Sequence, residues 1–361
     1  MTSFSELYNR YLSSNAVFSY PEDERIFRTR FKQVMFALFL VLVAVSPVFF
    51  NEGHYFIINL FLINLIAGLG LNLLMGFTGL FSLGHAAFLG VGGYTSALLI
   101  TKLGFPFLLS VLFAGLVTSI FGLLVGVPSL RIKGFYLMVA TLAFQFIIDH
   151  AIIHWDAVTR GIRGIELPTP VVFGFSLEKS SYFFYFAFLV VVLFMWGAKN
   201  LTRSKIGRAF VAVRDNDVSA EIIGIPVFRY KLLSFAIASF YAGVAGAMFC
   251  GLQRAAMPGD FTFFHSIGFL AMVLVGGLGS LLGTIFGVLF VTLIPFGLDA
   301  TVSWLARSYD PNLTIILGPV KELVFGLMII LFIIFEPVGL VGIWARFRDY
   351  FRIWPLPYVS E

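Results

Sequence analysis

The sequence predicts an all-α protein, a polytopic bundle of about ten transmembrane helices with both termini in the cytoplasm. Its 361 residues are 59% hydrophobic and only 12% charged, whereas a soluble domain keeps roughly a quarter of its residues charged. Apolar residues run continuously over long stretches, which is typical of helices in lipid, since membrane strands alternate apolar and polar residues. Lys and Arg gather in alternate loops, as the cytoplasmic side requires.

Residues 1–32 are predicted to form a cytoplasmic tail. They contain no apolar stretch of the kind that forms the core of a cleaved signal peptide. We therefore expect the apolar residues 33–50 to stay in the protein as the first span. The transmembrane domain is predicted to cover residues 33–345, and residues 346–361 are predicted to form a cytoplasmic C-terminal tail.

The later spans follow from apolar runs near the length of about 20 residues that a helix needs to cross a bilayer. In chain order they are 55–76, 82–100, 106–127, 134–153, 182–198, 232–251, 264–278, 281–298 and 322–337. With the N-terminus inside, the loops 77–81, 129–133, 199–231 and 279–280 also lie inside. The longest loop on the outside, residues 154–180, is too small for a core of its own.

Several classes of function are excluded or disfavoured. The chain has no glycine-rich P-loop, no dinucleotide-binding fingerprint and no Cys/His cluster, so we expect no catalytic site, metal or cofactor. The formal net charge of +5 sits at span ends and indicates no nucleic-acid partner. The single Cys250 excludes an intrachain disulfide. Ionisable side chains are nearly absent from the middle of the spans, although an ion-driven carrier usually needs a buried carboxylate there.

Residues 201–231, which we name the coupling loop, form a charged segment in this apolar chain. Ile206, Phe210 and Val213 share one helical stripe. Asp217 is predicted to cap a second short helix, which Gly224 and Pro226 would end. Two short helices would offer a docking surface to a soluble partner. The alternative is an electrostatic anchor at anionic lipid headgroups, which would not need this pattern.

Polar residues within the spans are candidates for a translocation path: Asn72, Ser82, His85 and Thr141. In lipid such groups must be satisfied by protein or by a wet cavity. The alternative for His85 is an interhelical hydrogen bond. For Thr141 the alternative is a bond to its own helix backbone.

Glycines at intervals of four, Gly279, Gly283 and Gly287, predict a close helix contact. Two more faces of small residues are Ala242/Gly246 with Gly243/Ala247, and Ala86/Gly90 with Gly93/Ala97. Packing within the chain is favoured over a subunit interface at each face. Apolar segments interrupted by glycine, such as residues 264–298, can also mark a translocation path.

Several segments together resemble the LivM-type permeases of branched-chain amino acid ABC importers. They are residues 67–99, GFYLMVATLAF (134–144), SKIGRAFVAVRDNDVSAEIIGI (204–225), YKLLSFAIASFYAGVAGAM (230–248), MVLVGGLGSLLGTIFGVLF (272–290) and FEPVGLVGIW (335–344). The resemblance covers roughly residues 35–345 in the order and spacing of the family. Two positions depart from it: residues 218–220 are Val-Ser-Ala in place of the EAA pattern of ABC importers, and Thr159-Arg160-Gly161 replaces Thr-Gly-Gly.

The resemblance implies a subunit without enzymatic activity in a transporter of the inner membrane. Its partners would be a homologous second permease subunit, two cytoplasmic ABC ATPases and an extracytoplasmic solute-binding protein. The substrate would be leucine, isoleucine or valine, with urea, short amides or other amino acids as alternatives. The coupling loop would contact the ATPase through Gly207, Arg208, Asp215, Asp217, Glu221 and Gly224. The rival hypothesis is a self-contained ion-coupled carrier.

Overall fold

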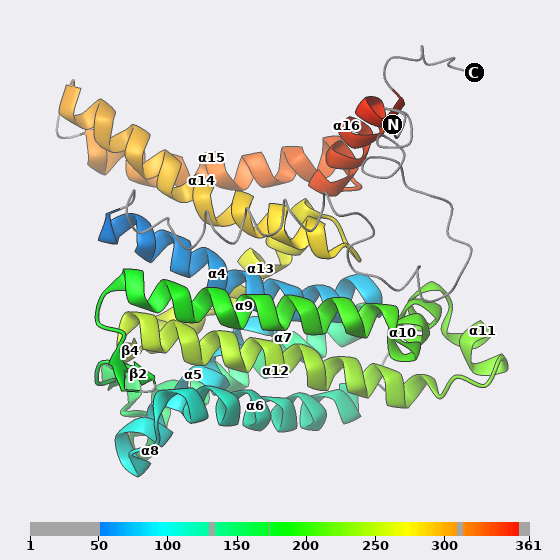
Figure 1. Ribbon diagram of the computed structural model, residues 1–361, viewed down its shortest axis with the longest axis horizontal. Coiled ribbons are helices and arrows are strands. Elements are labelled where there is room, and N and C mark those ends of the chain that lie inside the picture. Colours follow the sequence, from blue (N-terminus) through cyan, green and yellow to red (C-terminus); the bar gives the residue numbers. More distant parts are fainter. Residues whose placement is uncertain (1–50, 130–133, 173, 309–312, 354–361) are drawn as a thin grey trace, which may run out of the picture. The chain divides into compact units, whose positions relative to one another are not determined.

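The structure, a computed structural model, describes residues 51–129, 134–172, 174–308 and 313–353 (Figure 1). Within these ranges the chain is almost entirely helical, and 8 helices are long and apolar enough to cross a membrane. The prediction of an all-α polytopic bundle is therefore confirmed. The predicted span 33–50 lies outside the described residues.

The long helices follow the predicted spans in order. They are α4 (Glu52–Asn72), α5 (His85–Leu103), α6 (Phe107–Ser129), α7 (Phe135–His154), α9 (Ser180–Arg203), α12 (Val227–Gln253), α13 (Phe263–Gly276), α14 (Leu281–Ser308) and α15 (Leu313–Phe335). The last one overlaps the predicted span 322–337 but begins nine residues before it. A π-helical turn, η2 (Leu73–Phe77), continues α4.

Shorter elements connect the long helices or extend the chain. The helical ones are α8 (Asp156–Thr159), η3 (Gly161–Arg163), α10 (Lys205–Asp215), α11 (Asp217–Ile222), η4 (Pro258–Phe261) and α16 (Leu340–Ile353). The described strands are β1 (Ile165–Glu166), β2 (Val171–Val172), β3 (Phe175–Ser176) and β4 (Ala255–Ala256), paired β1 with β4 and β2 with β3. They lie in loops between the long helices. Helix α16 runs into the predicted C-terminal tail.

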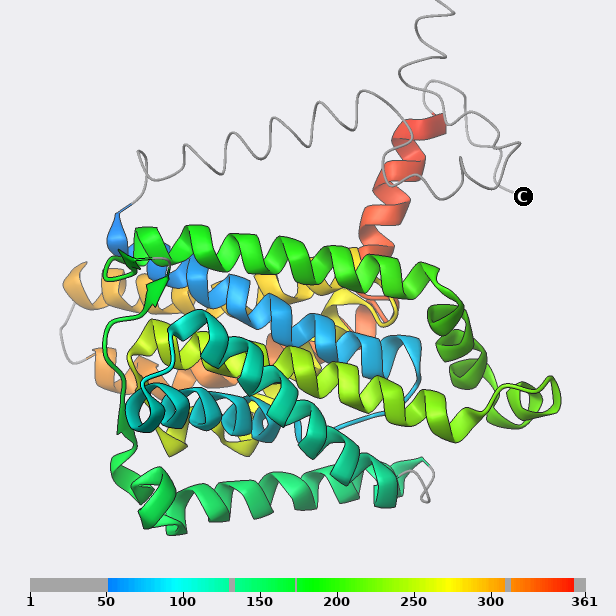
Figure 2. The same cartoon turned by 60° about the horizontal axis from the view of Figure 1, so that its bottom comes forward.

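Close backbone contact holds the centre of the bundle together. Helix α12 packs against both α5 and α6, and α6 and α12 run side by side in Figures 1 and 2. A Cβ on Gly92 of α5 would overlap the backbone of Gly243, and one on Gly246 would overlap that of Leu89. The predicted face on α12 therefore packs on α5 within the chain, since glycine lets these backbones approach closely. On α5 the contact runs through Leu89 and Gly92, and of the predicted α5 face Gly93 lies near Gly246 whereas Gly90 lies against Phe261.

Loops that the sequence places on opposite sides of the membrane lie at opposite ends of the long helices. Figure 1 shows α8, β2 and β4 at one end and α10 and α11 at the other. At the first end β1 pairs with β4 in the register Ile165 to Ala256. At the second end residues 78–81, Gly134 and residues 213–218 line one cavity. This grouping agrees with the predicted alternation of loops.

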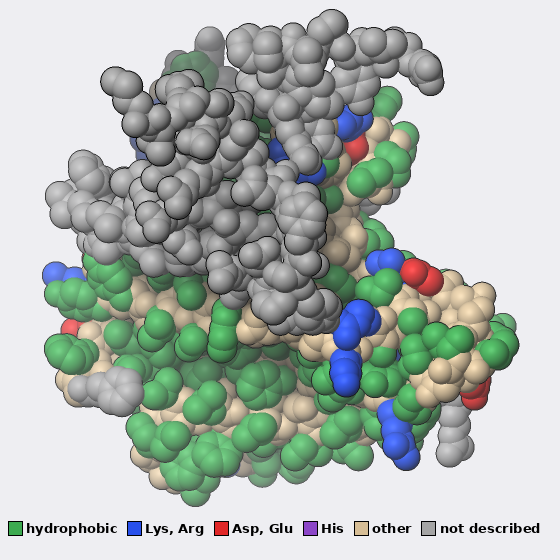
Figure 3. All heavy atoms as spheres, turned by 45° about the vertical axis from the view of Figure 1, so that its right-hand side comes forward, with side chains coloured by type: hydrophobic (Ala, Val, Ile, Leu, Met, Phe, Trp, Pro, Cys, Tyr) green, Lys and Arg blue, Asp and Glu red, His purple; other side chains and the backbone are tan. Residues whose placement is uncertain are grey.

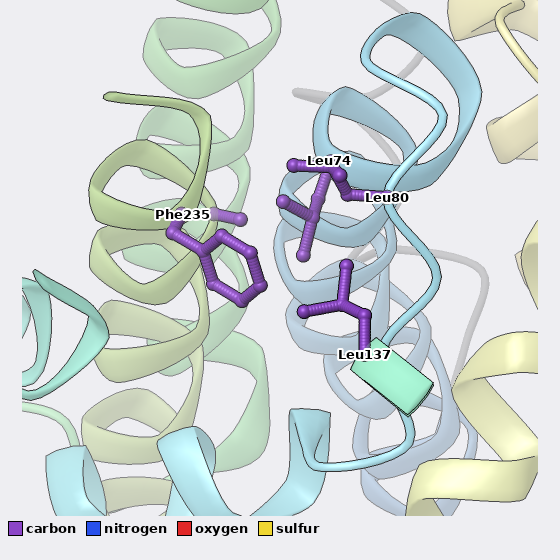
Figure 4. Packing of buried hydrophobic residues seen from close by; sticks show 5 residues of the cluster. Leu74, Leu80, Leu137 and Phe235 are labelled. Carbon is purple, nitrogen blue, oxygen red and sulfur yellow. The ribbon is translucent and has the colours of Figure 1, made fainter. Parts of the chain in front are cut away.

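A buried apolar cluster fixes the chain beneath the second end. Leu74 of η2, Leu80, Leu137 of α7 and Phe235 of α12 pack together (Figure 4). All four side chains are nearly inaccessible to solvent. The connection between η2 and α5 is therefore held by apolar packing from two other helices.

Candidate coupling site

The coupling loop forms two short helices between α9 and α12, as predicted. Helix α10 begins after Ser204, whose side-chain oxygen accepts hydrogen bonds from the backbone N–H of Ile206 at 3.2 Å and of Gly207 at 3.4 Å. Such a cap satisfies donors that have no partner within the helix. Helix α9 extends to Arg203, so the first three residues of the coupling loop, 201–203, are the last residues of this helix.

The prediction that Asp217 caps the second helix is wrong. Asn216 is the capping residue of α11, and its Oδ1 accepts the N–H of Ser219 at 3.0 Å. Asn216 has the extended backbone that a cap requires, with φ −161° and ψ 112°. Asp217 is then the first helical residue, and its carboxylate forms an ion pair with Lys231 of α12. That ion pair ties the start of α11 to the bundle.

Gly224 ends α11 in the way the sequence predicts. Its φ of +86° lies in the left-handed region, which favours glycine. The N–H of Gly224 donates to Glu221 O at 3.0 Å, and the N–H of Ile225 donates to Ala220 O at 3.0 Å. This pair of hydrogen bonds is a Schellman motif, which turns the chain back toward α12.

Apolar packing holds α10 on the bundle. Phe210 and Val213, two members of the predicted stripe, are buried. The Phe210 ring meets the Tyr230 ring edge-on, with centroids 6.3 Å apart. Gly207 is packed so closely that a Cβ there would overlap the carbonyl of Thr202. Gly207, the first glycine of the predicted coupling set, therefore lets α10 pack closely against the end of α9.

Apart from the half-buried Asp217, the charged members of the predicted coupling set lie on the outside of the loop. Arg208 is exposed, and its Nη1 donates to Arg203 O at 3.1 Å. Asp215 forms an ion pair with Arg214 at 3.0 Å. Glu221 is exposed on α11. In Figure 3, where this end of the bundle comes forward, Lys and Arg side chains gather near acidic ones beside a largely apolar flank.

The sequence interpretation missed an apolar surface on α11. Val218 is 60% exposed, Ile222 is 79% exposed and Ile223 is 72% exposed. Exposed apolar patches of this kind are typical of surfaces that contact another protein or a membrane. The signal was present as two isoleucines directly before Gly224 in an otherwise polar loop.

Arg214 is a second residue that the sequence interpretation missed. Its Nη1 donates to the carbonyl oxygen of Gly76 at 3.0 Å, which joins α10 to the end of η2. A cavity of about 380 Å³ lies beside this contact. Its lining includes Thr78, Gly79, Leu80, Phe81, Leu137, Arg214, Asp215, Asn216 and Lys231. No sequence signal distinguished Arg214 from the other cations of the loop.

Asn72, the first residue of the predicted translocation path, joins α4 to the turn between α13 and α14. Its Oδ1 accepts the N–H of Gly279 at 2.9 Å. Its Nδ2 donates to Ser280 O at 2.9 Å and to Thr284 Oγ1 at 2.7 Å. The buried amide is thus fully engaged by protein groups.

The other three residues of the predicted path gather around the connection between η2 and α5. Thr141 Oγ1 accepts the N–H of Leu83 at 3.0 Å and donates to Met138 O at 2.9 Å. Ser82 is buried, and its Oγ accepts the N–H of Gly84 at 3.4 Å. His85 Nε2 lies 2.9 Å from Ala67 O of α4. His85 and Thr141 therefore make the hydrogen bonds that the alternative interpretations predict.

The predicted glycine face divides into two parts. Gly283 and Gly287 of α14 pack against the backbone of α13, where a Cβ on Gly287 would overlap Met272 O. Gly279 lies in the turn before α14, with φ +75°, and so does not share the helical face of the other two. It meets Gly76 instead. The spacing of four residues between these glycines therefore does not reflect one helical face, because Gly279 lies in the turn and only Gly283 and Gly287 lie in α14.

Arg160 lies at the opposite end of the helices. It has the left-handed backbone conformation at the end of α8, with φ 61°, which is uncommon for a residue with a side chain. An open cavity of about 930 Å³ is lined by this segment, and its charged members are Asp156, Arg160, Arg163 and Glu166. Among the described residues, no group of His, Cys, Asp and Glu side chains could hold a metal ion.

Comparison with known proteins agrees with this architecture. The family model described as "Branched-chain amino acid transport system / permease component" matches residues 54–333. The LivM permease of Salmonella typhimurium is 31% identical over 335 residues, covering 86% of this chain and 75% of the relative. The BraD permease of Pseudomonas aeruginosa is 25% identical over 296 residues, covering 77% of this chain and 91% of the relative.

A relative with a different named substrate also matches. The autoinducer 2 import permease LsrC of Enterobacter sp. is 29% identical over 274 residues, covering 72% of this chain and 75% of the relative. No solved structure matches the chain. The family match and the LivM relatives together cover the bundle and the coupling loop. The chain therefore belongs to the family of branched-chain amino acid transport system permease components.

Proposed function

We propose that this chain is a permease subunit that carries leucine, isoleucine or valine across the inner membrane by alternating access, driven by ATP hydrolysis in partner subunits. It would pair with a homologous second permease subunit and with two cytoplasmic ABC ATPases. An extracytoplasmic solute-binding protein would deliver the substrate. The names of the LivM and BraD relatives support the substrate class. The folded coupling loop with its exposed apolar surface is the observation that carries the proposal.

The coupling loop has the properties that an ATPase contact requires. Val218, Ile222 and Ile223 offer an apolar surface, and fully burying one such side chain contributes about 1.5–3 kcal/mol. The Asp217–Lys231 ion pair and the buried Phe210 hold that surface on the bundle. ATP can drive the permease only if the ATPases bind its two states with different affinity. A docking surface that is held on the helices would change position when they move, which would give the ATPases such a difference in affinity.

Replacing Ile222 by serine tests the apolar docking surface. Ile222 is 79% exposed on the coupling loop, and Ile162 is 81% exposed at the opposite end of the helices. We expect Ile222→Ser to reduce ATPase co-purification at least tenfold, because the partner loses buried apolar area. The matched control, Ile162→Ser, should retain normal amounts of ATPase. Equal retention in both variants would reject this surface.

Charge reversal tests the polar part of the same surface. We expect the double variant Arg208→Glu and Asp215→Arg to insert into the membrane normally but to lose ATPase assembly and uptake. Insertion is measured by membrane fractionation, and assembly by the amount of ATPase that co-purifies. Normal uptake by the double variant would refute the docking role of these charges.

Reconstitution tests the transport activity itself. Proteoliposomes that contain both permeases, the ATPases and the binding protein should accumulate labelled leucine or valine in an ATP-dependent manner. Urea and autoinducer 2 serve as competing ligands, and preferential accumulation of either would reassign the substrate. Ion-gradient-driven uptake by this chain alone would instead establish the self-contained carrier.

A further inference from the structure

The end of η2 leaves a carbonyl group that the helix does not satisfy. The N–H of Leu80 donates to Leu74 O at 3.1 Å, and the N–H of Gly79 donates to Met75 O at 3.0 Å. Gly76 O receives its hydrogen bond from Arg214 Nη1 at 3.0 Å instead. The last carbonyls of a helix lack internal donors and form the negative end of its dipole. A guanidinium group is therefore well suited to this position.

A second break in helical structure faces the first one. Between α13 and α14 the chain turns through Gly277 and Gly279, with φ of +115° and +75°. Gly279 lies directly against Gly76, where a Cβ on Gly76 would overlap the N–H of Gly279. Asn72 hydrogen-bonds the same turn at Gly279 and Ser280. The end of η2 and the start of α14 are therefore joined by direct contact and by the hydrogen bonds of Asn72.

Arg214 contacts both breaks and is itself held by the coupling loop. Its Nε and Nη2 each lie 3.0 Å from Asp215 Oδ1, which leaves Nη1 to bind Gly76. A Cβ built on Gly279 would lie 3.1 Å from the same Nη1. The neighbouring cavity of about 380 Å³ leaves room for Arg214 and Asp215 to shift. Gly76 and Gly279, by contrast, are closely packed, and closely packed groups transmit displacements.

We propose that Arg214 is the positioning residue through which the coupling loop moves two helix breaks, residues 73–79 and 276–280, during transport. This inference rests on the proposed function and deepens it. Partner binding on α11 displaces α10, and the Arg214–Gly76 bond carries that displacement into η2. The Asn72 hydrogen bonds pass it on to α14. Non-α turns of this kind commonly occur at functional sites, since they can change their hydrogen-bonding register locally.

The test measures how many substrate molecules are imported per ATP hydrolysed by the reconstituted complex. The variant Arg214→Gln removes the bond to Gly76 and leaves the apolar surface of α11 intact. We expect normal ATPase co-purification, continued ATP hydrolysis and at least a tenfold lower import per ATP. A purely structural role for Arg214 would lower assembly and leave this ratio unchanged.

Two further variants keep the outcome decisive. Arg229→Gln removes an exposed cation from the first turn of α12 and should leave import per ATP unchanged. Arg214→Lys keeps the charge but cannot bind Asp215 and Gly76 with one planar group. If Arg214→Gln fails to fold, import per ATP is measured on Arg214→Lys instead. An unchanged ratio in a folded Arg214 variant overturns the inference. Absence of ATP-driven uptake in the unmodified complex would instead overturn the proposed function.

Discussion

At the scale of single residues, Asn72 shows how one buried amide can organise distant segments. Its three hydrogen-bonding partners lie at Gly279, Ser280 and Thr284. All of them come from a segment more than two hundred residues later in the chain. Within a bundle made mostly of apolar side chains, such a group specifies which helices meet and in which register. Removing it leaves the half-buried N–H of Gly279 without its acceptor, which is costly.

The variant Asn72→Ala is expected to lower the free energy of unfolding by about 2 kcal/mol, because the Gly279 N–H loses its acceptor and Thr284 Oγ1 loses its donor. Thermal unfolding of the detergent-solubilised protein measures the effect. Asn64→Ala on the same helix is the control, since Asn64 makes one longer hydrogen bond of 3.3 Å to Thr292. Equal midpoints for the two variants would contradict the structural role of Asn72.

Residue-level predictions from the sequence succeeded where the local chemistry has one solution. Gly224 ends α11 because few other residues adopt its backbone conformation. Asn216 and Asp217 are both good capping residues, so the pattern could not decide between them. The ion pair with Lys231 uses Asp217 elsewhere. The bond from Arg214 to Gly76 spans 138 positions, and no local pattern contains such a contact.

At the scale of elements, the crossing of α5 and α12 depends on glycine. Gly92, Gly243 and Gly246 allow two backbones to meet without side chains between them. Association of helices in lipid relies on such packing, since apolar surface gains little by leaving lipid. The sequence predicted the α12 face with Gly243 and Gly246, but it placed the α5 face at Gly90 and Gly93 and did not identify Gly92 as the contact. That information lies in the relative rotation of the helices.

The variant Gly246→Ala is expected to destabilise the protein by about 1–3 kcal/mol, because its Cβ would overlap Leu89 O. Gly268→Ala is the control, since Gly268 is also helical and a Cβ there meets open space. The control should be neutral or stabilising by up to about 1 kcal/mol, because alanine favours the helix. Thermal unfolding that shows the same change in both variants would argue against the close crossing.

At the scale of the whole molecule, hydrophobicity and the distribution of cations were enough to predict the spans and the alternation of loops. Each described span from 55–76 to 281–298 corresponds to a membrane-length helix. Boundaries were less predictable, as α9 continues to Arg203 and α12 begins at Val227. Polar residues can extend a helix beyond the bilayer without changing the apolar run from which the span was predicted.

Single-cysteine labelling tests the sidedness of the molecule. The natural Cys250 is buried and gives little background with a membrane-impermeant thiol reagent. We expect Phe175→Cys, a site that is 77% exposed, to react only from outside the cell. Ile222→Cys on the coupling loop should react only after the membrane is opened. Labelling of both sites from the same side would refute the predicted topology.

The short ladder between β1 and β4 also determines where the chain tolerates added sequence. It joins the loop after α7 to the end of α12 through the register Ile165 to Ala256, so an insertion beside Glu166 would separate paired backbones. Gly174, in the turn between β2 and β3, has open space around it. A peptide epitope or fluorescent reporter placed there would leave the ladder intact, because exposed turns accept insertions well.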